Sequence, residues 1–312
     1  MFYCPFRFLL AAGLILLHIT TTANEASEAA LRKHVIKLTT GQGHRNYRDT
    51  VALNRTAVYI NKEFSAVTKE AYMQGFTVNG VRYYNVYATF GPANAPRVII
   101  GAHYDVQGDK PGADDNASGV AGLLELARML AETDKSKWEM RVDLVAYSLE
   151  EPPYFGTQHM GSSVHATALF NNKTPVVGMV SMEMIGYYDD KKGSQDYPLG
   201  IMKLFYGSRG DYITVVRKTF DKRFSRLFTR KFRRGGGVDV KVFKGPRWIQ
   251  GIDYSDHRNY WQYKWPALMI TDGAFYRNKN YHTEDDTPET LDYLRMSSVV
   301  TRVYRAVVSI VG

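Results

Sequence analysis

From residue 98 onward, the chain alternates between short apolar runs rich in β-branched residues and longer segments whose apolar residues recur every three or four positions. Short runs of this kind are typical of buried strands, and the longer spacing is typical of amphipathic helices. The expected strands are 98–102, 142–149, 176–182 and 268–271, and the expected helices are 117–132, 159–170 and 290–310. Strands that alternate with helices form βαβ units, in which helices cover both faces of the sheet. We therefore predict an α/β fold, a three-layer αβα sandwich with a mostly parallel central sheet.

The remaining chain adds further elements without indicating a second domain. Helical spacing over 50–73 precedes a strand over 81–90, and we expect two more strands at 204–207 and 240–243. Hydrophobic residues make up 45% and charged residues 23% of the 312 residues, which is the balance of an ordinary globular protein. Because the sequence shows no internal repeat or linker, we predict one domain over residues 24–312.

The first 23 residues have the three parts of a secretory signal peptide. A start with one positive charge, Met1–Arg7, is followed by the apolar run Phe8–Leu17 and by small residues that end at Ala23. This run is shorter than the roughly 20 apolar residues that span a membrane. We predict a signal peptide at residues 1–23, cleaved after Ala23, and an exported protein that is periplasmic or secreted. An uncleaved anchor and a buried N-terminal helix are the alternatives.

The cysteine count restricts the chemistry of any metal site. Cys4 is the only cysteine and lies within the predicted signal peptide. The mature chain then has neither a disulfide framework nor a cysteine nucleophile, and a metal must be bound by His, Asp and Glu.

Positive charge is concentrated between Arg217 and Arg234. This segment holds nine Lys or Arg residues and a single acid, Asp221, within a chain of net charge +9. Its phenylalanines recur every three or four residues, which predicts an amphipathic helix. The basic side is either a solvated helix face or a surface that contacts an anionic membrane or an acidic partner. Export argues against nucleic acid as a partner.

Chemically active residues follow successive expected strands. His103 and Asp105 come directly after the strand 98–102, and Glu150 and Glu151 come at the end of the strand 142–149. Sheets of this type bind ligands at the carboxyl ends of their strands. Two adjacent carboxylates at such an end repel each other unless a cation compensates, and one of the pair is then available for acid–base chemistry.

Three more residues extend this pattern. Asp115 lies in the turn Pro111–Gly119, Glu183 follows the strand 176–182, and His282 follows the last core strand. Taken singly, each has an ordinary structural reading, such as an acid at a helix start. Together they supply oxygen and imidazole ligands, which suit Zn²⁺ and also Mn²⁺ or Co²⁺.

Six short segments of the sequence together resemble the motifs of a known family. The chain resembles the zinc aminopeptidases of metallopeptidase family twenty-eight, of the bacterial leucyl-aminopeptidase type, whose relatives include glutamate carboxypeptidase and glutaminyl cyclase. The matching segments are Gly101–Asp105, Pro111–Gly119, Ser148–Glu151, Glu183–Gly186, Ser255–His257 and Tyr281–Thr283. They occur in the family's order, and the resemblance runs from about Arg45 to the C-terminus.

The resemblance implies the fold of the zinc-dependent exopeptidases and two bound zinc ions. Asp115 would bridge both ions, His103 and Glu183 would complete one site, and Glu151 and His282 would complete the other. Many members carry Asp where this chain has Glu183, which is longer by one methylene and can still reach a metal.

The resemblance also implies the catalytic roles. Glu150 would act as the general base that takes a proton from the attacking water, and Asp105 would orient His103. The peptide bond between Asp115 and Asn116 is expected to be cis. The segment Ser255–His257 would form part of the site's wall, without His257 as a ligand.

The activity expected from the resemblance is removal of N-terminal residues from peptides. A carboxypeptidase or dipeptidase would need a cationic pocket, for which Arg209, Arg247, Arg258 and Arg277 are available. A glutaminyl cyclase would use the same scaffold for acyl transfer, but such enzymes usually carry Trp where this chain has Tyr281. A non-enzymatic binding protein on a peptidase scaffold is the third alternative.

Overall fold

A single eight-stranded mixed sheet forms the centre of the protein. The computed structural model describes residues 25–312, so the predicted signal peptide and Cys4 lie outside the described residues. The strands are β1 (Ala71–Val78), β2 (Val81–Phe90), β3 (Arg97–His103), β4 (Arg141–Tyr147), β5 (Val176–Met182), β6 (Tyr212–Lys218), β7 (Asp239–Gly245) and β8 (Ala267–Thr271). Their order across the sheet is β1-β2-β4-β3-β5-β8-β6-β7.

The four central strands, β4, β3, β5 and β8, are mutually parallel. All seven residues of β4 are buried, as expected for a strand covered by helices on both faces. Antiparallel pairs occur toward both sides, between β1 and β2, between β2 and β4, and between β6 and β8. The predicted α/β class with a mostly parallel sheet is therefore confirmed.

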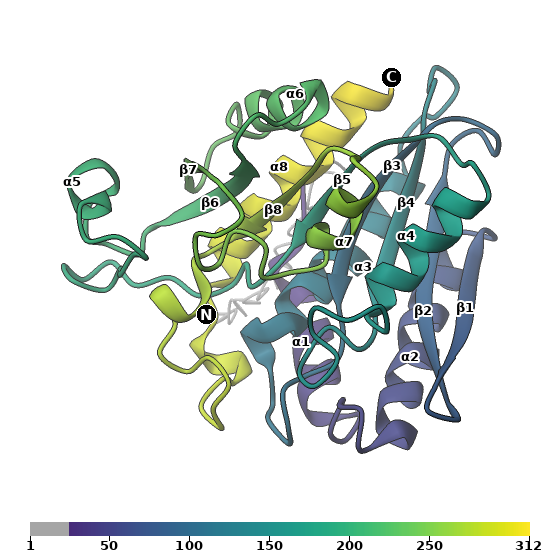
Figure 1. The fold of residues 1–312 in the computed structure, drawn as a ribbon, viewed down its shortest axis with the longest axis horizontal. Coiled ribbons are helices and arrows are strands. Elements are labelled where there is room, and N and C mark those ends of the chain that lie inside the picture. Colours follow the sequence, from purple (N-terminus) through teal and green to yellow (C-terminus); the bar gives the residue numbers. More distant parts are fainter. Residues whose placement is uncertain (1–24) are drawn as a thin grey trace, which may run out of the picture.

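Helices lie on both faces of this sheet (Figure 1). They are α1 (Glu28–Thr40), α2 (Thr50–Val67), α3 (Gly119–Ala131), α4 (Gly161–Asn171), α5 (Met202–Tyr206), α6 (Arg223–Phe232), α7 (His257–Gln262) and α8 (Tyr293–Val311). The larger apolar core joins the sheet to α1, α2, α3, α6 and α8, and a smaller core joins its other face to α4 and α7. Short helical turns also occur at Ala113–Ser118, Ala274–Tyr276 and Pro288–Thr290.

The helix expected over 50–73 is too long. It ends at Val67, and Ala71–Val78 forms β1, paired with β2 in the register Val78↔Val81. The connection is Asn79-Gly80, and both residues take positive φ angles, of 50° and 81°. An Asn-Gly pair between two β-forming segments is a strong signal for a two-residue hairpin, and it overrides the helical spacing of the preceding residues.

Two expectations in the second half are also wrong. The strand expected at 204–207 lies mostly in the short helix α5, whose neighbour Gly207 takes a φ of 79° and ends it. The amphipathic helix expected over 217–234 is shorter, because Tyr212–Lys218 is the strand β6 and the helix begins only at Arg223. Within residues 25–312, no helix is long and apolar enough to cross a membrane.

The parallel strands bring the segments of interest together. Met182 of β5 lies beside Ile270 of β8, and His103 of β3 lies beside Tyr147 of β4, so these strands end at one edge of the sheet. The residues that follow each strand therefore meet there.

Candidate metal centre

His103 is the last residue of β3, and its side chain is almost completely buried. Its Nδ1 lies 3.1 Å from the backbone carbonyl oxygen of Asp105, which can only accept a hydrogen bond. When the imidazole is neutral, Nδ1 therefore carries the proton, and Nε2 presents a lone pair to the centre of the cluster.

The carboxylate of Asp105 contacts both His103 and the turn after β4. Its Oδ1 lies 3.6 Å from Nδ1 of His103, and its two oxygens accept the backbone N–H groups of Glu150 and Glu151 at 3.1 and 3.0 Å. Asp105 thus holds the turn after β4 in place, and both its carboxylate and its backbone carbonyl lie beside Nδ1 of His103.

Asp115 lies between the two histidines. Its Oδ1 is 3.2 Å from Nε2 of His103, and its Oδ2 is 3.0 Å from Nε2 of His282. Oδ1 is buried and has no hydrogen-bond partner among the described residues, which leaves it free for a cation. The peptide bond from Asp115 to Asn116 is cis, as the resemblance implies.

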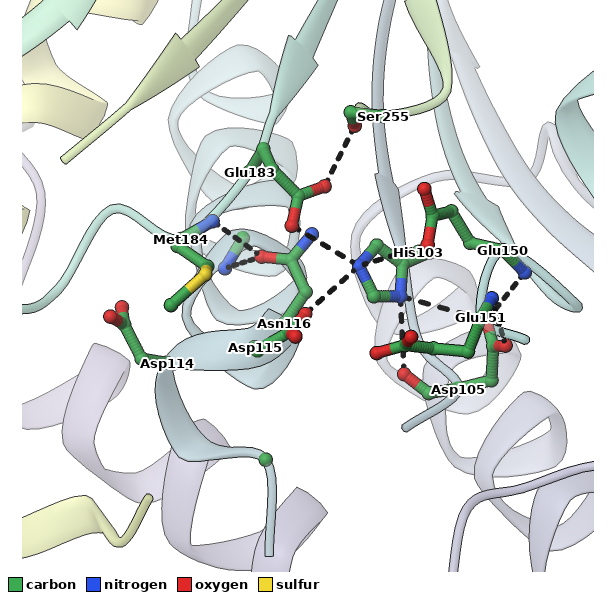
Figure 2. Close-up of polar contacts among 12 residues, drawn as sticks. His103, Asp105, Asp114, Asp115, Asn116, Glu150, Glu151, Glu183, Met184 and Ser255 are labelled. Carbon is green, nitrogen blue, oxygen red and sulfur yellow. Dashed lines mark hydrogen bonds and ion pairs between the residues drawn. The ribbon is translucent and has the colours of Figure 1, made fainter. Parts of the chain in front are cut away.

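Glu183 completes a group on one side of Asp115. Its Oε1 lies 3.3 Å from Nε2 of His103, and its Oε2 accepts a hydrogen bond from Ser255 Oγ at 2.7 Å (Figure 2). The hydroxyl of Ser255 also contacts Ser181 Oγ at 2.7 Å. Ser255 thereby fixes the longer side chain of Glu183 with one oxygen pointing to His103.

Glu151 and His282 form the group on the other side. Nε2 of His282 lies 3.1 Å from Oε1 of Glu151, and the imidazole stacks on the ring of Tyr281 with 3.7 Å between the ring centres. Glu150 is buried next to Glu151, with its Oε2 4.0 Å from Nε2 of His103.

These side chains present ligand atoms at the spacing that metal ions need. Three groups have atoms within 4.8 Å of one another: His103, Asp115 and Glu183; Asp115, Glu151 and His282; and His103, Glu150 and Glu151. The first two groups contain the five predicted ligands and share Asp115. Oxygen and imidazole donors without thiolate match the preference of zinc and related divalent ions.

Electrostatics shows how strongly the cluster attracts positive charge. Burial raises the pKa of Glu150 well above its ordinary value, and burial together with Asp115 raises the pKa of Glu151 to about 8. Burial lowers the pKa of His282, but Asp115 and Glu151 outweigh it and bring the pKa to about 10. Glu183 and Glu150 likewise hold the pKa of His103 well above its ordinary value, against the effect of burial.

Two further side chains hold Asp115 in place. Asp286 accepts the backbone N–H groups of Asp114 and Asp115 at 2.8 and 3.1 Å. Asn116 donates to the carbonyl of Met182 at 2.9 Å. It also accepts the N–H of Met184 at 3.1 Å (Figure 2), so the turn is tied to the end of β5 and to the residues that follow it. Sequence reasoning missed Asp286, although it lies only four residues after His282 among other acids.

The segment 255–257 contributes unequally to the wall of the site. Ser255 reaches Glu183, whereas His257 contacts the carbonyl of Ile252 with its Nε2 at 2.8 Å, away from the cluster. Asp256 is fully buried, neither of its carboxylate oxygens has a hydrogen-bond partner among the described residues, and burial raises its pKa to about 7.

A solved structure and two curated proteins are similar to this chain. The zinc aminopeptidase from Bacillus subtilis has the same fold, with a TM-score of 0.72 over 91% of this chain and 95% of that one, at 14% identity. The chain is 44% identical over 293 residues to the uncharacterized protein YfbL of Escherichia coli (strain K12), covering 91% of this chain and 89% of YfbL. It is 24% identical over 294 residues to leucine aminopeptidase 1 of Ajellomyces capsulatus (strain NAm1 / WU24), covering 89% and 70% respectively.

The fold and the cluster of carboxylates and imidazoles define a metal-dependent peptidase. The model of peptidase family M28 matches residues 85–307, and the chain belongs to this family. The match includes every predicted ligand.

The raised pKa values predict how metal affinity depends on pH. A metal ion needs neutral imidazole and ionised carboxylate, so binding must displace the protons that His103, His282 and Glu151 hold near neutral pH. We expect the affinity for zinc to rise with pH between 6 and 7.5 by about tenfold per pH unit for each proton released. Competition with a chromophoric chelator at several pH values measures this slope, and an affinity independent of pH would contradict the assignment.

Proposed function

We propose that the protein is a zinc aminopeptidase that removes N-terminal residues, preferentially large apolar ones, from peptides. The ligands would be His103, Asp115 and Glu183 for one zinc ion and Asp115, Glu151 and His282 for the other. Zinc supplies Lewis-acid chemistry, which lowers the pKa of water and polarises a carbonyl group. The zinc of the Bacillus subtilis relative and the orphaned oxygen of Asp115 support this choice.

The observation that carries the proposal is a cavity next to Glu183. Its wall is aromatic and aliphatic, and includes Met184, Met202, Tyr206, Phe243, Phe275 and Tyr281. The charged residues that line it are Glu183 and Asp196, and no Lys, Arg or His of the described residues does so. Such a cavity accepts an apolar side chain and a positively charged α-amino group.

The same cavity argues against a carboxypeptidase. Binding a C-terminal carboxylate needs a cationic partner, as in the common pairing of Arg with carboxylates. Arg277 is buried, does not line the cavity, and donates to Gln195 Oε1 at 2.8 Å and to the carbonyl of Tyr187 at 3.2 Å, while its Nη2 has no hydrogen-bond partner among the described residues. Arg209, Arg247 and Arg258 do not line the cavity.

Glu150 is the residue that fits the role of general base. Its carboxylate lies at the edge of the cluster, and burial gives it a raised pKa, so it can hold a proton during turnover. We assign to Glu150 the removal of a proton from the attacking water and its transfer to the departing amine. Glutaminyl cyclisation remains the alternative on this scaffold, and Tyr281 in place of the usual Trp supports hydrolysis over it.

The role of Glu150 predicts a separation of metal binding from turnover. Glu150→Gln keeps the volume of the side chain and removes the base, so kcat should fall by about 10²- to 10⁴-fold. Metal analysis should still find two zinc ions per chain. Glu139→Gln, at an exposed position, serves as the matched control and should keep normal activity. Near-normal activity of Glu150→Gln would refute this mechanism, and one zinc ion with cyclisation of N-terminal glutamine would favour the cyclase.

The cavity predicts which substrates are cleaved. Anilides of leucine, methionine and phenylalanine should be hydrolysed with a kcat/KM about 10²-fold or more above that of the glutamate anilide, whose charge the acidic wall repels. N-acetylation should abolish cleavage because it removes the positive charge. Equal cleavage of free and acetylated peptides in assays with and without chelator would show that the cavity does not bind the amino terminus.

The N-terminal segment leads to a proposal about location. A signal peptide at residues 1–23 would direct the peptidase to the periplasm or the medium. Mass spectrometry of exported protein should give a chain that begins at Asn24, and a chain beginning at Met1 would refute cleavage after Ala23.

A further inference from the structure

Helix α6 and the residues that flank it present six exposed basic side chains, which we call the α6 basic face. They are Lys222, Arg223, Arg226, Arg230, Arg233 and Arg234. None of the six forms an ion pair with a carboxylate of residues 25–312. The one acid of this segment, Asp221, is paired with Arg217. The positive charge of this face is therefore uncompensated within the described chain.

The opposite side of α6 is anchored in the core. Phe224, Phe228 and Phe232 are buried, and Phe228 and Phe232 are stacked with their ring centres 5.9 Å apart. Phe224 also packs close to Gly178 of β5, where an added Cβ would lie 2.1 Å from the phenylalanine ring. The basic face is thus held rigidly on the surface, and α6 has no second apolar side with which to insert into a bilayer as a whole.

A cavity adjoins the start of α6, and we call it the Phe220 cavity. Three lysines (Lys218, Lys222 and Lys264) and three aromatic residues (Phe220, Trp261 and Trp265) line it. The one acid in its wall, Asp221, is paired with Arg217. The ammonium group of Lys218 lies 5.4 Å from the ring centre of Trp261, and its pKa is lowered by burial and then by Arg247 and Lys222. This combination favours an anion that also has an apolar part.

The Phe220 cavity contains one unpaired hydroxyl group and adjoins an uncapped helix start. Ser225 lines the cavity and is fully buried, and its hydroxyl has no hydrogen-bond partner within the described chain. Lys222, at the N-terminal cap position of α6, makes no capping hydrogen bond; its side chain donates to the carbonyl of Lys264, and the first turn contains no acid. The start of this ten-residue helix therefore adds its positive dipole end beside the three lysines, while the preceding Asp221 is paired with Arg217.

Phe220 itself has no role in the packed protein. Its side chain is 95% exposed, and its backbone takes a φ of 59°, which is disfavoured for a bulky residue. An exposed aromatic ring beside basic residues is typical of proteins that contact the headgroup region of a membrane, where aromatic rings and cations are both favoured.

The α6 basic face and the Phe220 cavity lie away from the metal centre. Pro266 and Ala267, which line the Phe220 cavity, lie at the start of β8, whereas the metal centre lies beyond the ends of the parallel strands. Figure 1 shows α6 next to α8, at the end of the molecule where α8 finishes. A binding partner on α6 would therefore leave the metal centre open to peptides.

We propose that the α6 basic face and the Phe220 cavity together form a docking surface for a membrane of anionic phospholipids. Lipid phosphate groups pair with the six basic side chains, one phosphate group occupies the Phe220 cavity, and the Phe220 ring enters the headgroup region. A lipid surface fits better than a soluble acidic partner, because it explains the exposed ring and the aromatic cavity as well as the charge.

Vesicle flotation with the mature chain tests the proposal. Vesicles of equal parts phosphatidylglycerol and phosphatidylcholine should bind the protein, and phosphatidylcholine alone should not. Each basic side chain near an anionic surface contributes about a fivefold factor in affinity. Arg226→Glu/Arg230→Glu/Arg233→Glu should therefore reduce binding by about 10²-fold or more, with unchanged peptidase activity on a soluble anilide.

A matched variant separates this surface from overall charge. Lys33→Glu/Lys62→Glu/Lys69→Glu makes the same change in net charge at exposed positions on α1, on α2 and after α2. It should alter vesicle binding by less than about threefold, because only residues near the lipid surface contribute strongly. Phe220→Ala should weaken binding also at high salt, where the charges are screened.

Four results would overturn the proposal. The first is an equal loss of vesicle binding in the two triple variants, and the second is equal binding to anionic and neutral vesicles. The third is release from vesicles by inorganic phosphate but not by sodium chloride of equal ionic strength, and the fourth is tighter binding to soluble polyglutamate than to vesicles. The third result would identify a soluble phosphate compound as the ligand, and the fourth would identify an acidic polypeptide.

Discussion

Mutual repulsion among buried carboxylates is the constraint around which this protein is organised. Asp115, Glu150, Glu151 and Glu183 lie close together at the ends of parallel strands, with the two imidazoles of His103 and His282 among them. Burying so many negative charges is costly unless cations compensate them. The raised pKa values of His103, Glu151 and His282 indicate that bound protons compensate part of this charge in the absence of a metal ion. Metal binding is thus built into the electrostatics of the fold.

The surrounding structure fixes these groups through backbone hydrogen bonds. The carboxylates of Asp105 and Asp286 each accept two successive backbone N–H groups, one pair at Glu150–Glu151 and the other at Asp114–Asp115. Ser255 fixes the extra length of Glu183. Partners of this kind orient metal ligands and set their basicity. They come from three separate segments of the chain, and a change in any of them would act on the centre without touching a ligand.

Much of the architecture could be predicted from the sequence, because the central strands are continuous apolar runs. The predicted strand 176–182 matches β5 at both ends, and the residues after each such strand meet at one edge. Predictions were wrong where local spacing was ambiguous. The segment at 71–78 forms an edge strand because the Asn79-Gly80 turn pairs it with β2, and 204–207 lies mostly in α5. The sequence also did not reveal the role of Asp286, the contact of Ser255 with Glu183 or the cavity beside Glu183, which depend on how distant loops pack.

The separation of negative from positive charge on the protein follows from the same strand topology. The strand ends that deliver the ligands lie beside the aromatic cavity with its acidic wall, whereas the basic α6 lies by the start of β8. A chain with a net charge of +9 thus keeps a negatively charged centre and concentrates its positive charge elsewhere. Under the proposed function, this separation would let a cationic amino terminus approach the centre while the proposed membrane contact lies away from it.

Anomalous X-ray diffraction at the zinc absorption edge, from crystals grown with zinc, tests the central claim most directly. The account predicts two strong peaks, one on each side of Asp115, the first bounded by His103 and Glu183 and the second by Glu151 and His282. A single peak, or peaks away from Asp115, would contradict it.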